Sequence, residues 1–299
     1  MIASGRTAVA ALAAAASLAG AAALPGGGTA AEPVPAAAAN DCLDEEAREA
    51  KGLLCPDLRM RPPFDLDRDK TAGGVPILRA ANSIDSVGDG PAELKGKRDG
   101  DLSMEAKQRI STEKRRRLTY ATGARLAFKF IPGQGRYWKF RDAARFELWE
   151  LDDEGRRGRR VEIGPKQIYC LRDLEHTRPG MKGSPNRRVF PSCNRDPGRR
   201  AVTLGTSVGW SDVYPASYHQ NWIELDHLPA SGCYAYVHVA DPKNGIYELD
   251  ETNNEASTVV FLTKGGQYKP GRCGGIHDES LAPSQSAGDL EVDGPGGEY

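Results

Sequence analysis

The residues that could carry chemistry gather in two stretches in the second half of the chain. The first runs from Gly209 to Tyr214 and is followed by Trp222, so aromatic side chains flank a polar loop. The second is the segment 248–254, in which Glu248, Asp250, Asn253 and Asn254 offer hard oxygen donors. Such oxygens bind calcium. A turn between two strands is the alternative, because asparagine tolerates left-handed backbone.

Histidine is the commonest side chain at transition-metal sites, and the spacing of the histidines here argues against a cluster. The chain contains five of them: His176, His219, His227, His238 and His277. His219 lies five residues after Tyr214 and is the best single candidate for a metal ligand. No two of the five have metal-site spacing, so each is expected to lie at the surface or at the edge of the core.

The elements that would position these residues are predominantly strands. Apolar and polar residues alternate over 125–131, which is typical of a half-buried strand, and further strands are expected at 75–83 and 233–240. The composition includes 34 glycines and 20 prolines, which favours many turns. The sequence therefore predicts an all-β protein, an antiparallel β-sandwich with long loops and minor helices.

Two segments are expected to be helical and one to be a loop. Asp41 could cap a short helix that ends near Leu54, and the segment 102–118 has helical character with Met104 and Ile110 among charged residues. The segment 85–101 is rich in glycine, aspartate and lysine, which predicts a loop.

Five segments, taken in order, resemble motifs of the lysyl oxidase family between about Cys55 and Cys273. They are Leu78–Ser83, Phe146–Leu151, Gly164–Asp173, Trp210–Trp222 and Glu248–Asn254. The family resemblance implies a copper-dependent oxidase of primary amines, including lysine side chains, which become aldehydes. It also implies a lysyl tyrosylquinone cofactor, made from a lysine that matches Lys166 and a tyrosine that matches Tyr214.

The resemblance to the family does not extend to the copper ligands. The family binds copper through His-x-His-x-His on one strand, and the matching positions here are Tyr137, Lys139 and Arg141. Lysine is protonated at neutral pH and arginine offers no lone pair. A fixed cation about 4 Å from a metal charge would repel it by ~4 kcal/mol per unit charge pair. The local sequence therefore opposes copper binding, although copper is the metal that the resemblance implies.

The N-terminal segment 1–31 has the charge, apolar run and small residues of a secretory signal, so the chain is expected to be secreted. A leader and short helix follow at 32–54, then a lysyl oxidase-like domain at 55–264 and a disordered glycine-rich acidic tail at 265–299. The apolar run is short for a membrane span. No membrane span is expected.

Six cysteines are expected to form disulfides, because exported proteins oxidise their thiols. They are Cys42, Cys55, Cys170, Cys193, Cys233 and Cys273. Proximity in sequence favours pairing each with its nearest neighbour in that order, and the spacing does not fit a zinc site.

The formal net charge of −1 gives no overall attraction to nucleic acid, and the basic runs at 114–117 and 156–160 are expected to be solvated. Two main functions follow from the sequence, and a polyanion-binding protein that uses the arginine clusters is a third, more distant hypothesis. One is the amine oxidase, acting on small amines or protein lysines. The other is a catalytically inactive extracellular β-sandwich that binds a partner or has a structural role.

Overall fold

The computed structural model describes residues 39–281. The expected signal segment 1–31 and residues 282–299 of the expected tail lie outside the described residues. The elements of the described part are one short helix and sixteen strands: α1 (Glu45–Lys51), β1 (Leu53–Leu54), β2 (Leu58–Met60), β3 (Phe64–Lys70), β4 (Pro76–Ser86), β5 (Ala92–Gly100), β6 (Ser103–Thr112), β7 (Arg117–Tyr120), β8 (Arg125–Ile131), β9 (Gly135–Leu151), β10 (Arg157–Ile163), β11 (Gln167–Tyr169), β12 (Ala201–Thr206), β13 (Ser211–Tyr214), β14 (Trp222–Glu224), β15 (Gly232–Ala240) and β16 (Glu255–Leu262).

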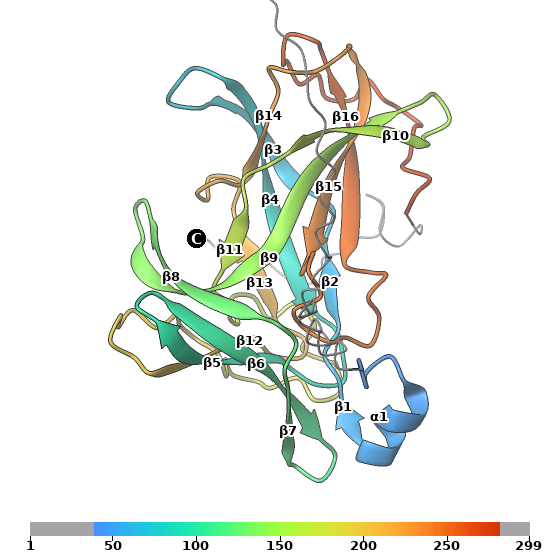
Figure 1. Cartoon of the computed structure of the whole chain (residues 1–299). Coiled ribbons are helices and arrows are strands. Elements are labelled where there is room, and N and C mark those ends of the chain that lie inside the picture. Colours follow the sequence, from blue (N-terminus) through green and yellow to red (C-terminus); the bar gives the residue numbers. More distant parts are fainter. Residues whose placement is uncertain (1–38, 282–299) are drawn as a thin grey trace, which may run out of the picture. The chain divides into compact units, whose positions relative to one another are not determined.

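The strands of the described part form two sheets, and every strand pair in them is antiparallel. The larger sheet has the order β12-β5-β6-β8-β9-β15-β16, with β1 and β7 added on β6 and with β10 and β11 added on β9. The smaller sheet is built around β4, which pairs with β2, β3, β13 and β14. The expected all-β antiparallel fold is confirmed (Figure 1).

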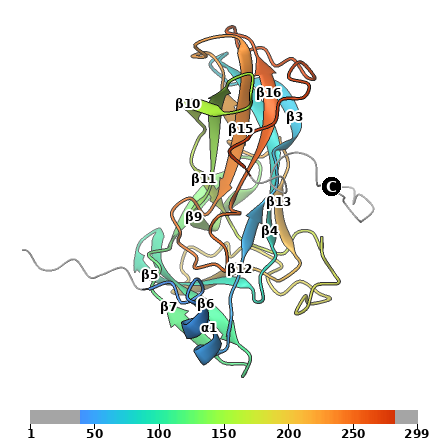
Figure 2. The ribbon, with the colours of Figure 1, turned by 90° about the vertical axis from the view of Figure 1, so that its right-hand side faces the viewer.

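The main core joins the two sheets. Leu78 and Ile84 of β4 belong to the same buried cluster as Phe146 of β9 and Tyr236 of β15. Alternate residues of each strand point inward, so burial of these apolar side chains supplies the main drive for the sheets to pack together. A view from the side shows β4 and β15 running along each other (Figure 2).

The long strand β9 crosses the larger sheet from one part to the other (Figure 1). Its first half pairs with β8 and its second half with β15. Asp142, between these halves, has a φ of 54°, so the strand bends there in left-handed backbone that an aspartate tolerates. The region 135–151 therefore forms one bent strand of 17 residues.

The expected helix over 102–118 is wrong, because this segment forms β6 and β7. Every second residue of β6 from Met104 to Thr112 is buried, which is the period of a strand. The expected loop over 85–101 contains β5, which pairs with β6. Its lysines Lys95 and Lys97 are exposed on either side of the buried Gly96, so composition alone concealed this alternation.

The short N-terminal helix is confirmed as α1, with a different cap. Asp44 is the N-cap and accepts a hydrogen bond of 3.1 Å from the backbone N–H of Ala47, where Asp41 had been expected. Gly52 ends the helix in left-handed backbone. No helix within residues 39–281 is long and apolar enough to cross a membrane.

The three expected disulfides are confirmed. They join Cys42 to Cys55, Cys170 to Cys193 and Cys233 to Cys273. The first fixes α1 to the start of β2, and the second fixes the long 175–200 loop to the end of β11. Three disulfides suit a protein that folds in an oxidising compartment.

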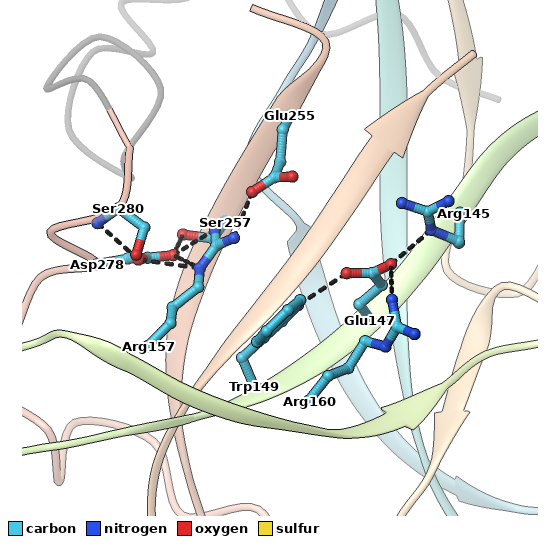
Figure 3. A network of polar contacts seen from close by, with 9 residues as sticks. All are labelled: Arg145, Glu147, Trp149, Arg157, Arg160, Glu255, Ser257, Asp278 and Ser280. Carbon is cyan, nitrogen blue, oxygen red and sulfur yellow. Dashed lines mark hydrogen bonds and ion pairs between the residues drawn. The ribbon is translucent and has the colours of Figure 1, made fainter. Parts of the chain in front are cut away.

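Residues 274–281, which we call the C-terminal strap, belong to the segment for which the sequence predicted a disordered tail. In the strap, Asp278 is fully buried and is held by Arg157 of β10 through two-point contacts of 2.7 and 2.9 Å (Figure 3). The hydroxyl of Ser257 donates to the same carboxylate at 2.8 Å. At Gly155 an added Cβ would lie 1.9 Å from the His277 carbonyl oxygen, so the strap runs against the β9–β10 turn.

Candidate functional site

Tyr214 ends β13 and lies in the interior of the protein. Its backbone pairs with Asn82 of β4, and its side chain is only 3% exposed. The ring stacks on that of Tyr169, with centroids 3.9 Å apart and an angle of 15° between the planes. The hydroxyl donates a 2.9 Å hydrogen bond to Asp212. Tyr214 is thus held in one orientation by ring packing and by one polar contact.

Tyr169 brings together three of the segments that resemble lysyl oxidase motifs. Its hydroxyl accepts from the Asn82 amide at 2.9 Å and donates to Asn221 Oδ1 at 2.9 Å. Asn82 lies in the first of the five segments, Tyr169 in the third, and Tyr214 and Asn221 in the fourth. Residues far apart in sequence therefore meet at one buried point between β4, β11 and β13.

Lys139 of β9 enters the same region from the larger sheet. Its side chain is fully buried, and the Nζ donates to the Tyr218 hydroxyl at 2.7 Å and to the Ile168 carbonyl oxygen at 3.1 Å. The amine lies 4.4 Å from the centroid of the Tyr137 ring. Tyr218 in turn packs edge-on against Tyr214, with ring centroids 4.7 Å apart. We call Lys139, Tyr137, Tyr169, Asp212, Tyr214 and Tyr218 the lysine–tyrosine cluster.

A chain of hydrogen bonds leads from the buried amine toward the surface. Tyr137 donates to Gln134 Oε1 at 2.7 Å, and Gln134 is exposed. The two hydroxyls of Tyr137 and Tyr218 are 3.0 Å apart. Because the Tyr137 proton is committed to Gln134, Tyr218 donates to Tyr137 and accepts from Lys139. The chain therefore connects the amine to solvent through two phenols.

The cluster favours neutral forms of its ionisable groups. Burial lowers the pKa of Lys139 to about 7, against a partial opposing effect of Asp212. Burial also raises the pKa of Asp212 well above its ordinary value, although Tyr214, Arg172 and Lys139 oppose the shift. The pKa values of Tyr169, Tyr214 and Tyr218 are all raised by burial. Low local polarity penalises every charged form, so the three phenols stay protonated at neutral pH.

Lys166, the lysine expected to form the quinone, lies outside this cluster. It precedes β11 and its side chain is exposed. Within the described residues, no hydrogen bond, ion pair or ring contact joins it to Tyr214. The residue after it, Gln167, turns inward and donates to the carbonyl oxygens of Pro165 and Gln220 at 2.9 and 2.6 Å. The lysine whose amine the fold places beside the tyrosines is Lys139.

The five histidines are separated in the fold. His219 is half-buried and packs edge-on against Trp222, and burial, with Lys139 and Arg79 adding to it, lowers its pKa. His176 stacks on Trp210 at 4.3 Å, and His238 stacks on Phe146 at 3.8 Å inside the core. His227 is exposed beside Asp226. Across residues 39–281, no three histidine, cysteine or acidic side chains form a group that could hold a metal ion.

The positions that match the copper ligands differ in their environments. Tyr137 and Lys139 point into the cluster, while Arg141 is exposed next to the bend at Asp142. A phenol of raised pKa and a lysine hydrogen-bonded to protein oxygens offer no ready ligand for copper. These residues do not fit a copper ion.

The segment 248–254 forms a second buried polar group, near the start of β2. Glu248 accepts from the backbone N–H of Leu58 and from the Asn254 amide, which is 3.0 Å away. Burial raises the pKa of Glu248 well above its ordinary value, and Asp241 and Glu251 add to this effect. The amide oxygens of Asn253 and Asn254 are buried without hydrogen-bond partners. These contacts hold the segment 248–254 against the start of β2, as a turn between β15 and β16.

Sequence reasoning missed Lys139 as a site residue and did not single out Tyr169 or Tyr218. Lys139 was taken only as a lost metal ligand, although it lies between Trp138 and Phe140 in an otherwise apolar part of a strand. A lysine in such surroundings is a signal for a buried amine. Tyr218 had no such signal, because only the fold shows that the turn after β13 brings it over the ring of Tyr214.

Comparisons with known proteins add no assignment. No family model matches the sequence, and no curated protein matches it.

Proposed function

We propose that this chain is a lysyl oxidase-like domain in which the lysine–tyrosine cluster replaces the copper and quinone centre. In this proposal it acts as an extracellular binding or structural module and does not oxidise amines. The observation that carries the proposal is the position of Lys139. Its amine occupies the middle of the expected metal-ligand positions and is hydrogen-bonded to Tyr218 and to the Ile168 carbonyl oxygen.

Descent from the oxidase family is supported by the convergence of the resembling segments. Asn82, Tyr169 and Tyr214 come from three of these segments. Asn82 is hydrogen-bonded to Tyr169, and the Tyr169 ring stacks on that of Tyr214. Secretion is supported by the expected signal segment and by the three disulfides, which need an oxidising compartment to form.

Loss of the oxidase activity is supported by charge and by access. A cation at Lys139 would repel copper by several kcal/mol, and a neutral Lys139 remains engaged with its two oxygen acceptors. Tyr214 is 3% exposed and Lys139 is fully buried, so a substrate amine has no contact with either group. The oxidase remains the alternative, and it requires copper and a Lys166–Tyr214 cross-link.

The test is copper loading of the full chain in air, followed by metal analysis, intact mass and a peptide map. We expect less than stoichiometric copper and separate peptides for Lys166, Lys139 and Tyr214. As a positive control, the triple variant Tyr137→His, Lys139→His, Arg141→His restores the three imidazoles and should retain more copper. A cross-linked lysine–tyrosine peptide in the wild type would overturn the proposal and establish the oxidase.

A further inference from the structure

Positive charge is concentrated in a groove on the outer face of the larger sheet. The groove has a volume of about 590 Å³ and lies across β12, β5, β6 and β7. Five cationic side chains line it, namely Lys95, Lys97, Lys107, Arg109 and Arg200, with Glu105 as the one acidic side chain in the lining. We call it the basic groove. The whole chain has a formal net charge of −1, so this concentration is local.

Strand register places two lysines directly opposite each other in the basic groove. Lys95 of β5 pairs with Lys107 of β6, and both side chains are exposed. Like charges at directly opposed positions destabilise a sheet. Next along the same pair of strands, Lys97 lies opposite Glu105, which is the favourable arrangement. The Lys95–Lys107 pair therefore does not stabilise the sheet, which suggests that it has another role.

The cations of the groove are only partly neutralised by the protein. Arg109 contacts Glu93 at 3.0 Å, and Arg117 adds a second contact to this carboxylate at 3.6 Å. Among residues 39–281, no carboxylate lies within ion-pair distance of Lys95, Lys97 or Lys107. These lysines can therefore take part in binding an anion without first breaking an internal ion pair.

We propose that the basic groove binds a linear phosphate-bearing polymer that has no aromatic groups. Alternate side chains on a strand lie ~7 Å apart and neighbouring strands ~4.8 Å apart, so the lysines form an array that can meet successive anionic groups of an extended chain. Lysine acts as a point charge toward phosphate, without the planar fork that arginine uses. The proposal rests on this face alone and is independent of whether the lysine–tyrosine cluster has a function.

The lining of the groove distinguishes this ligand from nucleic acid. Single-stranded nucleic acids gain much of their affinity when bases stack on aromatic side chains. The lining contains lysine, arginine, glutamate, glycine, alanine and threonine and no aromatic side chain. Affinity must then come from phosphate contacts and the release of counterions, so it should fall steeply with salt.

The experiment is titration of the full chain with inorganic polyphosphate of one defined length, by calorimetry over a series of salt concentrations. We expect Lys95→Gln/Lys107→Gln to weaken binding at 50 mM salt by ~20-fold or more and to lower the salt slope by about 1.4–1.8, because two phosphate contacts are lost. The control Lys70→Gln/Lys243→Gln removes the same charge from exposed lysines outside the groove and should bind as the wild type does.

A second measurement uses the wild type and so does not depend on variants folding. Bound polyphosphate should protect Lys95 and Lys107 from acetylation, detected by mass spectrometry, and should leave Lys70 and Lys243 reactive. The proposal is overturned if the wild type does not bind, if both double variants weaken equally, or if the groove lysines stay unprotected. Tighter binding of RNA or of heparin at equal charge would overturn the choice of a non-aromatic phosphate polymer.

Discussion

Replacing Lys139 with methionine is expected to stabilise the protein by about 3 kcal/mol at pH 6 and to destabilise it by about 1 kcal/mol at pH 10. Few core substitutions change sign in this way. Methionine is unbranched and adapts to irregular space, so it fills the volume of the lysine stem. The variant removes the ionisable amine and its two hydrogen bonds and leaves the packing largely in place.

The reversal follows from the pKa of Lys139. Its folded value of about 7 lies below the ordinary value of 10.5, so between these pH values the unfolded chain holds a proton that the folded chain lacks. Wild-type stability therefore rises with pH through this window. Below pH 7 the free-energy cost of burying the charged amine, roughly 5 kcal/mol for this pKa shift, opposes folding in full. At pH 10 little of it remains, and the loss of contacts to Tyr218 and Ile168 decides the sign.

Urea unfolding of wild type and variant at pH 6, 8 and 10 measures this difference directly. Lys129→Met, at an exposed position on β8, is the matched control and should change stability little at any pH. A Lys139→Met difference that stays constant with pH would mean that Lys139 is charged when folded. A charged amine would need a counter-charge, and Asp212 is the acidic residue of the cluster that could supply it.

Replacing Asp278 with alanine is expected to lower the free energy of unfolding by about 3 kcal/mol, because it leaves Arg157 without its main partner. The Asp278 side chain is 0% exposed and that of Arg157 is 11% exposed, so water cannot readily replace the contact. Glu255 still contacts Arg157 and limits the loss. The neighbouring Glu279→Ala, at an exposed position, should change stability by less than about 0.5 kcal/mol.

A double variant separates the ion pair from the rest of the C-terminal strap. Arg157→Met combined with Asp278→Ala removes both charges, and we expect it to cost less than the sum of the single variants. Denaturant unfolding of all four proteins gives this coupling. If Asp278→Ala cost under about 1 kcal/mol, the strap would be dispensable and the tail predicted from Gly265 would be the better description.

The strands were predictable wherever apolar and polar residues alternate with the two-residue period of a strand. The alternation in 125–131 and 233–240 predicted β8 and β15, and the order of the cysteines predicted all three disulfides. The segment 102–118 misled because its charged residues also suit a helix. Pairing of β6 with β5, β7 and β8, contacts that the local sequence does not reveal, makes the strand favourable.

The candidate site was less predictable, because it depends on which side chains end up buried. Lys166 and Lys139 are both lysines on or next to strands, and motif order pointed to Lys166. The fold exposes Lys166 and buries Lys139 between two tyrosines. Similarly, Asp278 comes from a glycine-rich segment that predicts disorder, yet its carboxylate is among the least exposed in the described part. Burial of this kind is set by long-range packing.

The sharing of β9 between the two parts of the larger sheet bears on how the chain reaches its fold. Residues 135–140 pair with β8, whereas 144–150 pair with β15, which lies almost a hundred residues later in the chain. The second half of β9 thus cannot be completed until the distant β15 arrives. Contacts between residues so far apart slow folding. Until β15 pairs with it, the second half of β9 has an unpaired strand edge. Pairing of this edge with a strand of another chain would lead to aggregation.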